Sequence, residues 1–174
     1  MRRGRDLSAI SPGRLPYVLD NSVVSALHQA RALSRVLELW PGRWLVPAEV
    51  RDEATQWKAE RDRILRILDD LSSQRVVDYT EIDPHTEGPL FARLSRTLGQ
   101  GESAAIAVAH QRGLGVALDD QAARRACERI NPPVTWIATE EILLCAATEG
   151  QLSPEEARGI WIATGITDLK RQIL

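Results

Sequence analysis

The sequence predicts an α/β sandwich whose central parallel sheet has about four or five strands, flanked by helices. Two patterns support this fold class. Short apolar runs of the length of a buried strand alternate along the chain with longer segments of helical apolar spacing. Acidic residues also stand where several of these runs end and where helices begin. In a parallel sheet, strand ends and helix starts meet at one edge, and sites form there.

The expected elements follow one another closely. Strands are expected at residues 17–19, 44–46, 75–79, 115–118 and 134–138. Helices are expected at residues 23–32, 33–39, 47–57, 64–71, 90–98, 101–113, 122–130 and 139–149, and again from 154. Pro47 suits the first turn of the helix that it opens, Thr139 could cap a helix, and Gly150 suits the position just after that helix ends. Residues 153–156 are a typical helix start, with Glu156 in the position of a capping box.

Length and composition fit one globular domain. The chain has 174 residues, of which 44% are hydrophobic and 26% are charged. We expect this domain at residues 17–174, with a helical tail from about residue 151. Residues 1–16 contain four arginines and little apolar pattern, so we expect a flexible arm. An arm that contacts RNA is the alternative.

The net charge and the cysteines indicate which partners and which cellular compartment to expect. The formal net charge is −2, so no global basic field marks a nucleic-acid binder, although an acidic site can mask a local basic rim. The two cysteines form no CxxC motif and suit a reducing cytosol, so we expect a cytoplasmic protein. No apolar stretch in the sequence approaches the length that crosses a bilayer, so no membrane partner is expected.

Two acids stand in the first half of the predicted edge. Asp20 ends the first apolar run, where it could equally cap the helix that follows. Glu53 shares a helical face with Val50, Ala54 and Trp57, and a carboxylate on an apolar stripe is costly unless it is paired or bound. A salt bridge from Glu53 to a basic neighbour such as Arg51 or Arg61 is the alternative to a functional role.

Two more acids complete the edge. Glu102 opens a helix after Gly99-Gln100-Gly101, where the helix dipole alone would explain an acid. The two glycines could suggest a phosphate cradle, but a fixed carboxylate there would repel phosphate, so a cation fits better. Asp119 and Asp120 close a strand. We favour Asp119 as the ligand because it continues the strand most directly, with Asp120 as a helix cap.

The chemistry of four gathered carboxylates points to a metal ion. Such groups repel one another unless a cation lies between them, and hard oxygen ligands suit Mg²⁺ or Mn²⁺. Glu140 and Glu141, after the last expected strand, are weaker candidates for the same site. The acids would repel a polyanion without the ion. Arg124 and Arg125, beside Asp119, are therefore candidates for substrate binding, with a solvated surface as the alternative.

Four segments resemble, in the same order, the motifs of PIN-domain proteins. Residues 17–22 resemble the opening strand with its Asp-x-Ser, and residues 46–53 resemble the V-P-x-x-V-x-x-E segment. Residues 98–109 resemble the L-G-x-G-E-x-x-A-I-x-L-A segment of one bacterial and archaeal subgroup. Residues 117–124 resemble its L-x-D-D-x-x-A-R segment. The resemblance covers roughly residues 17–150, and the third segment is the most specific.

This resemblance implies a Rossmann-like α/β/α sandwich with an Mg²⁺- or Mn²⁺-dependent ribonuclease site. Carried across, the catalytic acids are Asp20, Glu53, Glu102 and Asp119. The metal ligands among them are Asp20, Glu102 and Asp119, and the supporting residues are Ser22 and Asp120. The chain departs from the family in two places: many members carry Asp where Glu102 stands, and residues 134–139 lack a Thr-Gly-Thr pattern that is frequent in the subgroup.

The resemblance also implies partners. Many family members are VapBC-type toxins that cleave single-stranded RNA and are neutralised by a small antitoxin protein, and homodimers are common. Leu27, Leu33, Val36 and Leu37 form a candidate surface for an amphipathic partner helix, with ordinary core packing as the alternative. The competing hypothesis for function is a non-catalytic PIN-fold module that acts through a protein or nucleic-acid partner.

Overall fold

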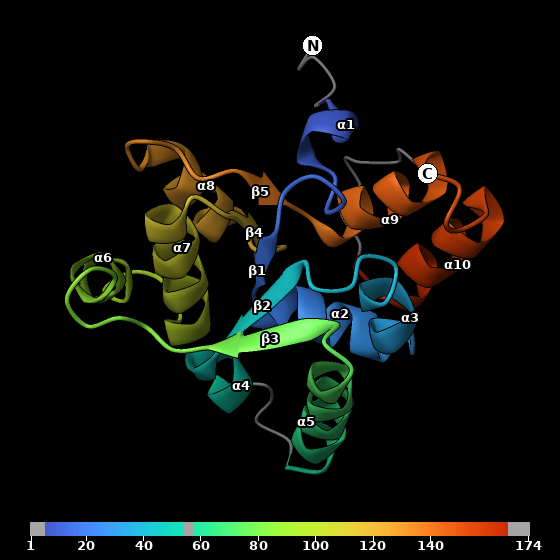
Figure 1. The fold of residues 1–174 in the computed structure, drawn as a ribbon, viewed down its shortest axis with the longest axis horizontal. Coiled ribbons are helices and arrows are strands. Elements are labelled where there is room, and N and C mark those ends of the chain that lie inside the picture. The colour runs from blue at the N-terminus through green and yellow to red at the C-terminus, as the bar shows by residue number, and fades with distance from the viewer. Residues whose placement is uncertain (1–5, 54–57, 167–174) are drawn as a thin grey trace.

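The computed structural model describes residues 6–53 and 58–166. Five strands in these ranges form one parallel sheet in the order β3-β2-β1-β4-β5. The strands are β1 (Tyr17–Leu19), β2 (Trp44–Pro47), β3 (Val77–Thr80), β4 (Gly115–Ala117) and β5 (Trp136–Ile137). The sheet and the helices that flank it confirm the predicted α/β fold class (Figure 1).

Helices separate every pair of consecutive strands. They are α1 (Leu7–Ile10), α2 (Asn21–Gln29), α3 (Leu33–Leu37), α4 (Ala48–Glu53), α5 (Lys58–Ser73), α6 (Gly88–Leu94), α7 (Gln100–Arg112), α8 (Gln121–Arg129), α9 (Thr139–Thr148) and α10 (Pro154–Ala163). Within the described ranges, no helix combines the length and the apolar character that a membrane span needs.

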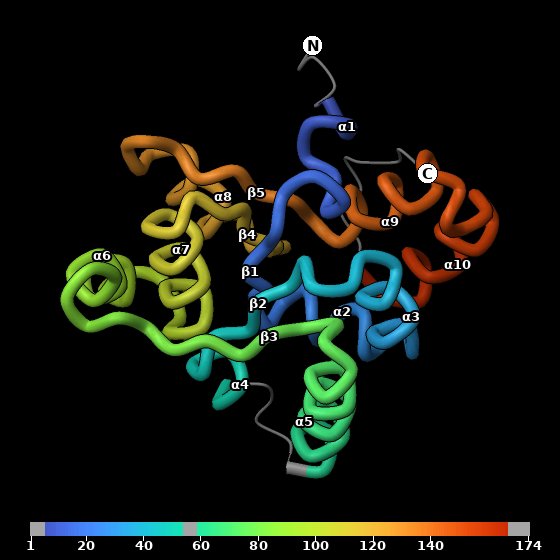
Figure 2. The backbone as a smooth tube through the Cα atoms, viewed as in Figure 1, coloured from blue at the N-terminus to red at the C-terminus, as the bar shows by residue number. Residues whose placement is uncertain are grey.

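The sheet separates two hydrophobic clusters, which makes the domain a three-layer sandwich. Successive side chains of a strand point to opposite faces. Accordingly, Tyr17 and Leu19 of β1 join one cluster and Val18 joins the other. The first cluster includes side chains of α2, α3, α5, α9 and α10, and the second includes those of α6, α7 and α8. Figure 2 shows α6 and α7 on one side of the sheet and α3, α9 and α10 on the other.

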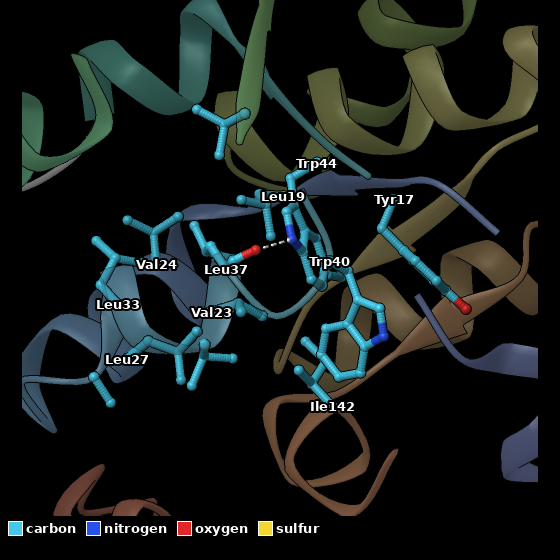
Figure 3. Packing of buried hydrophobic residues seen from close by; sticks show 14 of the residues in the cluster. Tyr17, Leu19, Val23, Val24, Leu27, Leu33, Leu37, Trp40, Trp44 and Ile142 are labelled. Atoms are coloured by element: carbon cyan, nitrogen blue, oxygen red, sulfur yellow. Dashed lines mark hydrogen bonds between the residues drawn. The ribbon is translucent and has the colours of Figure 1, made fainter. Parts of the chain in front are cut away.

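Trp44 lies at the centre of the first cluster. Its ring is fully buried, and its Nε1–H donates to the carbonyl oxygen of Leu37 at 3.0 Å (Figure 3). Trp40 meets Trp44 edge to face at 6.1 Å between ring centroids, a geometry that aromatic pairs favour. This hydrogen bond and ring contact fix α3 and the turn after it against the sheet.

The prediction that α2 and α3 offer a surface to a partner helix is wrong. Leu27, Leu33, Val36 and Leu37 are all core residues, none more than 2% exposed. Figure 3 shows Leu27, Leu33 and Leu37 packed inside the first cluster, with Trp44 beyond Leu37. Their helical spacing is the same whether the face they form is covered by this chain or by a partner, so periodicity alone could not separate the two cases.

The N-terminal segment differs from the expected flexible arm over residues 6–16. Asp6 caps α1, Ile10 is buried, and the hydroxyl of Tyr17 donates to the Ile10 carbonyl at 2.7 Å. The hydroxyl of Ser11 donates to Glu149, which ties the segment to the end of α9. These few apolar residues are too short a run to show a period, and long-range contacts hold them in place. Residues 1–5 lie outside the described residues.

Several predicted boundaries shift by one or two residues. Pro47 ends β2 instead of opening α4. Ala138, and not Thr139, is the N-cap residue of α9, and its N–H donates to Glu141 Oε2 at 3.0 Å. Two boundaries are as predicted. Ser153 caps the start of α10, where its Oγ accepts from the Glu156 N–H. Gly150 follows the end of α9 and has φ +73°.

Candidate functional site

The carboxyl ends of the parallel strands bring the predicted acids to one edge of the sheet. Asp20 follows β1, Asp119 and Asp120 follow β4, and Thr139 follows β5. Glu53 ends α4, the helix after β2, and Glu102 lies in the first turn of α7. The site is therefore built where parallel α/β sheets usually place one.

Asp20 is a buried carboxylate with two different oxygens. Oδ2 accepts from the backbone N–H of Ser22 at 2.9 Å and from its hydroxyl at 2.5 Å, so it caps α2. Oδ1 is buried and has no hydrogen-bond partner among the described residues. Burial raises the pKa of Asp20, Ser22 opposes that rise, and the charge of Glu53 adds to it. The cap and the functional hypothesis are compatible, because each uses a different oxygen.

Glu53 and Glu102 are both held at the start of α7. The backbone N–H of Gln100 donates to Glu53 Oε1 at 2.9 Å, and that of Gly99 donates to Glu102 Oε2 at 3.1 Å. The first N–H groups of a helix lack partners within it and stabilise negative charge. The turn at residues 99–101 is therefore a cradle for two of the chain's own carboxylates.

The charges of four acids meet at Glu102. Burial is the largest cause that raises the pKa of Glu102, and the Gly99 N–H lowers it. The charges of Asp20, Asp120 and Glu53 raise it further. The charges of three other carboxylates thus reach Glu102 and disfavour its ionisation, as in a site that several acids share.

Arg51 and Arg61, the partners considered for the alternative in which Glu53 forms a salt bridge, pair with other acids. Arg51 pairs with Asp69 at 3.7 Å and lies over the Tyr79 ring, and Arg61 pairs with Asp52 at 3.8 Å. The described contacts of the Glu53 carboxylate are with the start of α7.

Asp119 has a different environment from the other acids. Its Oδ1 accepts from the Thr139 N–H at 3.0 Å, and its Oδ2 accepts from the Thr139 hydroxyl at 2.6 Å. Arg124 Nη2 adds a contact to Oδ1 at 3.3 Å. Asp119 therefore links β4 to the start of α9, while Asp120 caps α8 through its Oδ1 and places its charge near Glu102.

A family model described as PIN domain matches residues 16–162. The chain belongs to the PIN-domain family. Members of this family are generally nucleases that use divalent metal ions, so a nucleic acid is the substrate class that the family suggests. A search of the curated proteins found no match.

The donors of this PIN domain fit a divalent ion in kind. They are all carboxylates, which suit Mg²⁺ or Mn²⁺. The buried Oδ1 of Asp20 has no hydrogen-bond partner among the described residues, and a bound cation would provide one favourable contact for it. As the side chains stand, no group of three or more His, Cys, Asp or Glu in residues 6–53 and 58–166 is arranged to hold a metal. The carboxylates of Glu53 and Glu102 are turned to α7 by hydrogen bonds from Gln100 and Gly99.

Arg124 is part of the PIN domain's internal framework. Its Nε donates to the Leu118 carbonyl at 3.3 Å, it pairs with Asp119, and its guanidinium lies 4.9 Å from the centre of the Trp136 ring. The side chain is only 16% exposed. Arg125, its neighbour on α8, is exposed. Of the two predicted substrate-binding arginines, the geometry leaves Arg125 as the accessible one.

Sequence reasoning missed the parts of the site that act through the backbone or from a distance. Thr139 was expected to cap a helix and instead holds Asp119. Gln100 contributes only its N–H, which no residue pattern reveals. Trp136 is buried in the second cluster at 8% exposed, so it is not placed to stack on a base. Trp57, which was expected on the same helical face as Glu53, lies outside the described residues.

Proposed function

We propose that this PIN domain is an Mg²⁺- or Mn²⁺-dependent endoribonuclease that cleaves single-stranded RNA. The observation that carries the proposal is the environment of the buried Asp20. Its Oδ1 has no hydrogen-bond partner among the described residues. Its charge interacts with those of Glu53 and Glu102. A buried, unpartnered carboxylate oxygen among other carboxylates lowers the stability of the fold. Groups of this kind occur most often at functional sites, where they bind a ligand or take part in catalysis.

Asp20, Glu102 and Asp120 are the residues that we assign to the metal, with Glu53 in the same acidic set. A bound ion would supply an activated water and charge to stabilise the scissile phosphate. Ser22 fixes one oxygen of Asp20 by hydrogen bonds, and the other oxygen is buried with no hydrogen-bond partner among the described residues. The Ser22 hydroxyl in turn accepts from the Asp119 N–H at 3.0 Å, so its proton is left to donate to Asp20. Asp119 acts in this scheme by holding Thr139 and orienting Ser22.

The choice of Asp120 over Asp119 revises the assignment made from the strand pattern. The Asp119 carboxylate is occupied by donors on Thr139 and Arg124, whereas the charge of Asp120 raises the pKa of Glu102. We therefore propose Asp120, and not Asp119, as the carboxylate that contributes its charge to the metal site.

We also propose that the chain is the toxin of a toxin–antitoxin pair. The support is its resemblance to the VapBC-type subgroup at residues 98–109 and 117–124. A nuclease that acts on cellular RNA needs restraint, and Arg or Lys from a small partner could pair with the acids and compete with the metal. A homodimer, frequent among such proteins, is part of the same proposal.

A non-catalytic binding module is the second candidate. The hydrogen bonds from Gln100 and Gly99 favour it, because they satisfy Glu53 and Glu102 without any cation. In that case the acids would stabilise the turn before α7, and function would rest on a partner's contact with the domain.

Cleavage of a labelled single-stranded RNA decides between the two candidates. The wild type should cleave with Mn²⁺ or Mg²⁺ and not with EDTA, and Asp20→Asn should not cleave under either condition. A single-stranded DNA of the same sequence tests the choice of RNA. Cleavage that persists in Asp20→Asn would point to a contaminating nuclease and reject the proposed site.

Expression in the chain's own host tests the toxin role. Growth should slow when the chain is expressed alone and recover when the product of the neighbouring gene is co-expressed. Co-purification of the two products, followed by size-exclusion chromatography of each, reports the complex and the dimer. A chain that cleaves RNA in vitro without slowing growth would be a nuclease but not a toxin.

A further inference from the structure

Glu53 is an exposed residue whose carboxylate is held from another helix. It is the last residue of α4 that the structure describes. The contact that holds the carboxylate is the hydrogen bond from the Gln100 N–H to Oε1 at 2.9 Å, in the first turn of α7. The position of Glu53 therefore depends on what the start of α7 allows.

Gly101 leaves the space that the Glu53 carboxylate occupies. A methyl group at the Cα of Gly101 would lie 2.5 Å from Glu53 Oε2 and 3.4 Å from Glu53 Cδ, and real carbon atoms essentially never come as close as the first distance. The other near atom is Val50 Cγ2, also at 3.4 Å, which is a tight contact that a small shift relieves. The overlap is with the carboxylate alone, the far end of a flexible side chain, so an added methyl group would turn the carboxylate aside.

Glycine at this position opposes the local preference of the chain. Gly101 is buried in the first turn of the 13-residue helix α7, where alanine is the better helix former. The positions three and four residues later, 104 and 105, are both alanine and fully buried. A missing side chain at residue 101 is therefore explained by the carboxylate above it and not by the needs of the helix.

We propose that Gly101 is a positioning residue for Glu53. The lack of a side chain lets the carboxylate settle on the start of α7, one residue before Glu102, so that both acids are presented to the site by one turn. Gly99 contributes the N–H that holds Glu102, and Gln100 the N–H that holds Glu53. The steric part of this inference is independent of the metal, and its consequence for the metal rests on the proposed function.

A double-mutant cycle on the metal-free protein tests the steric part. The variants are Gly101→Ala, Glu53→Ala and the two together, with thermal unfolding in EDTA as the measurement. Gly101→Ala alone should lower the midpoint, because the displaced carboxylate loses its hydrogen bond from Gln100. In the Glu53→Ala background the same change should be neutral or should raise the midpoint, because the overlap is gone and alanine favours the helix.

Gly159→Ala is the matched control. Gly159 lies in the helix α10, and an added Cβ there meets nothing within 4 Å. This change should leave the midpoint unchanged or raise it, in both backgrounds. An equal loss from Gly101→Ala with and without Glu53 would assign the glycine to packing against Val50 and overturn the inference. Failure of both Gly101→Ala proteins to fold would overturn it in the same way.

Mn²⁺ binding to the folded variants gives a measurement that a merely structural role would not move. Calorimetry should show Gly101→Ala binding Mn²⁺ at least about tenfold more weakly than the wild type, and Gly159→Ala binding it equally well. Wild-type affinity in Gly101→Ala would reject the positioning role. If the wild type itself binds no Mn²⁺, the proposed function fails, and the cycle in EDTA still decides the steric relation between Gly101 and Glu53.

Discussion

The carboxylate of Asp119 accepts two hydrogen bonds from Thr139, one from the backbone N–H and one from the hydroxyl. This contact joins the end of β4 to the first residue of α9. Asp120 has no such contact among the hydrogen bonds of the described residues; it caps α8 and its charge reaches Glu102. Two adjacent acids therefore have separate tasks, one in the framework and one in the acidic cluster.

The first prediction separates those tasks by mutation. Asp119→Ala should lower the free energy of unfolding by about 3 kcal/mol, because it leaves Thr139 and the largely buried Arg124 without their acceptor. Asp120→Asn should change stability by less than about 0.5 kcal/mol, because asparagine caps a helix as well as aspartate does. Urea unfolding in EDTA measures both.

The metal response should show the opposite order. Asp120→Asn should lose the Mn²⁺-induced rise in unfolding midpoint, while Asp119→Asn, chosen to remain folded, should keep most of it. A normal Mn²⁺ response in Asp120→Asn together with its loss in Asp119→Asn would restore Asp119 as the ligand.

The second prediction concerns Asp20. Asp20→Asn should abolish metal-dependent RNA cleavage and leave the fold intact, because the amide fills the same space and can keep the contact with Ser22. In EDTA the variant should be as stable as the wild type or more stable by about 1 kcal/mol, because one buried charge is removed from beside Glu53 and Glu102. Thermal unfolding with and without Mn²⁺ is the measurement.

Asp70→Asn provides the charge-matched control for Asp20→Asn. Asp70 is exposed on α5, so the variant has the same net charge change without touching the acidic cluster. It should keep both cleavage and the metal response. Equal stabilisation by Mn²⁺ in Asp20→Asn and in the control would show that Asp20 is not a ligand.

The fold class could be predicted because the same physical cause shapes the sequence and the structure. Parallel strands buried on both faces are continuous apolar runs, as at residues 17–19 and 115–118, and the helices between them need one apolar face. The segment at residues 6–16 could not be predicted. Its place depends on contacts of Ser11 with Glu149 and of Leu7 with Cys145, which link distant parts of the chain.

The site could be predicted to the level of an edge and a set of acids, but not to the level of each role. The strand pattern favoured Asp119 over Asp120, and only the position of Thr139, 20 residues later, shows that the Asp119 carboxylate is occupied. Charge alone likewise favoured Arg124 and Arg125 together. Whether an arginine forms internal contacts or faces solvent depends on neighbours such as Trp136, whose position in space the sequence does not give.

The third prediction concerns the thiol of Cys127. The residue is fully buried in α8, and burial raises the pKa of its thiol to about 12. Because the thiolate is the reactive form, the native protein at neutral pH should react with a thiol reagent more than about tenfold more slowly than the unfolded protein. Cys145, which is also buried, should behave alike, so rapid labelling of the native chain would contradict the packing of α8 or α9.

The last prediction distinguishes the two neighbouring arginines of α8. Arg124→Ala should lower the free energy of unfolding by about 2 kcal/mol, since it removes the pair with Asp119 and the contact with the Trp136 ring. Arg125→Ala should leave stability within about 0.5 kcal/mol, because that side chain is exposed.

RNA binding should follow the opposite order, provided that it is measured with Asp20→Asn present to prevent cleavage. Arg125→Ala should weaken the affinity for single-stranded RNA and reduce its dependence on salt, because one phosphate contact is lost. The exposed Arg158 on α10 is the control, and Arg158→Ala should change neither stability nor affinity. Equal affinities in Arg125→Ala and Arg158→Ala would show that α8 does not contact the RNA backbone through Arg125, and the solvated-surface alternative would then hold for that residue.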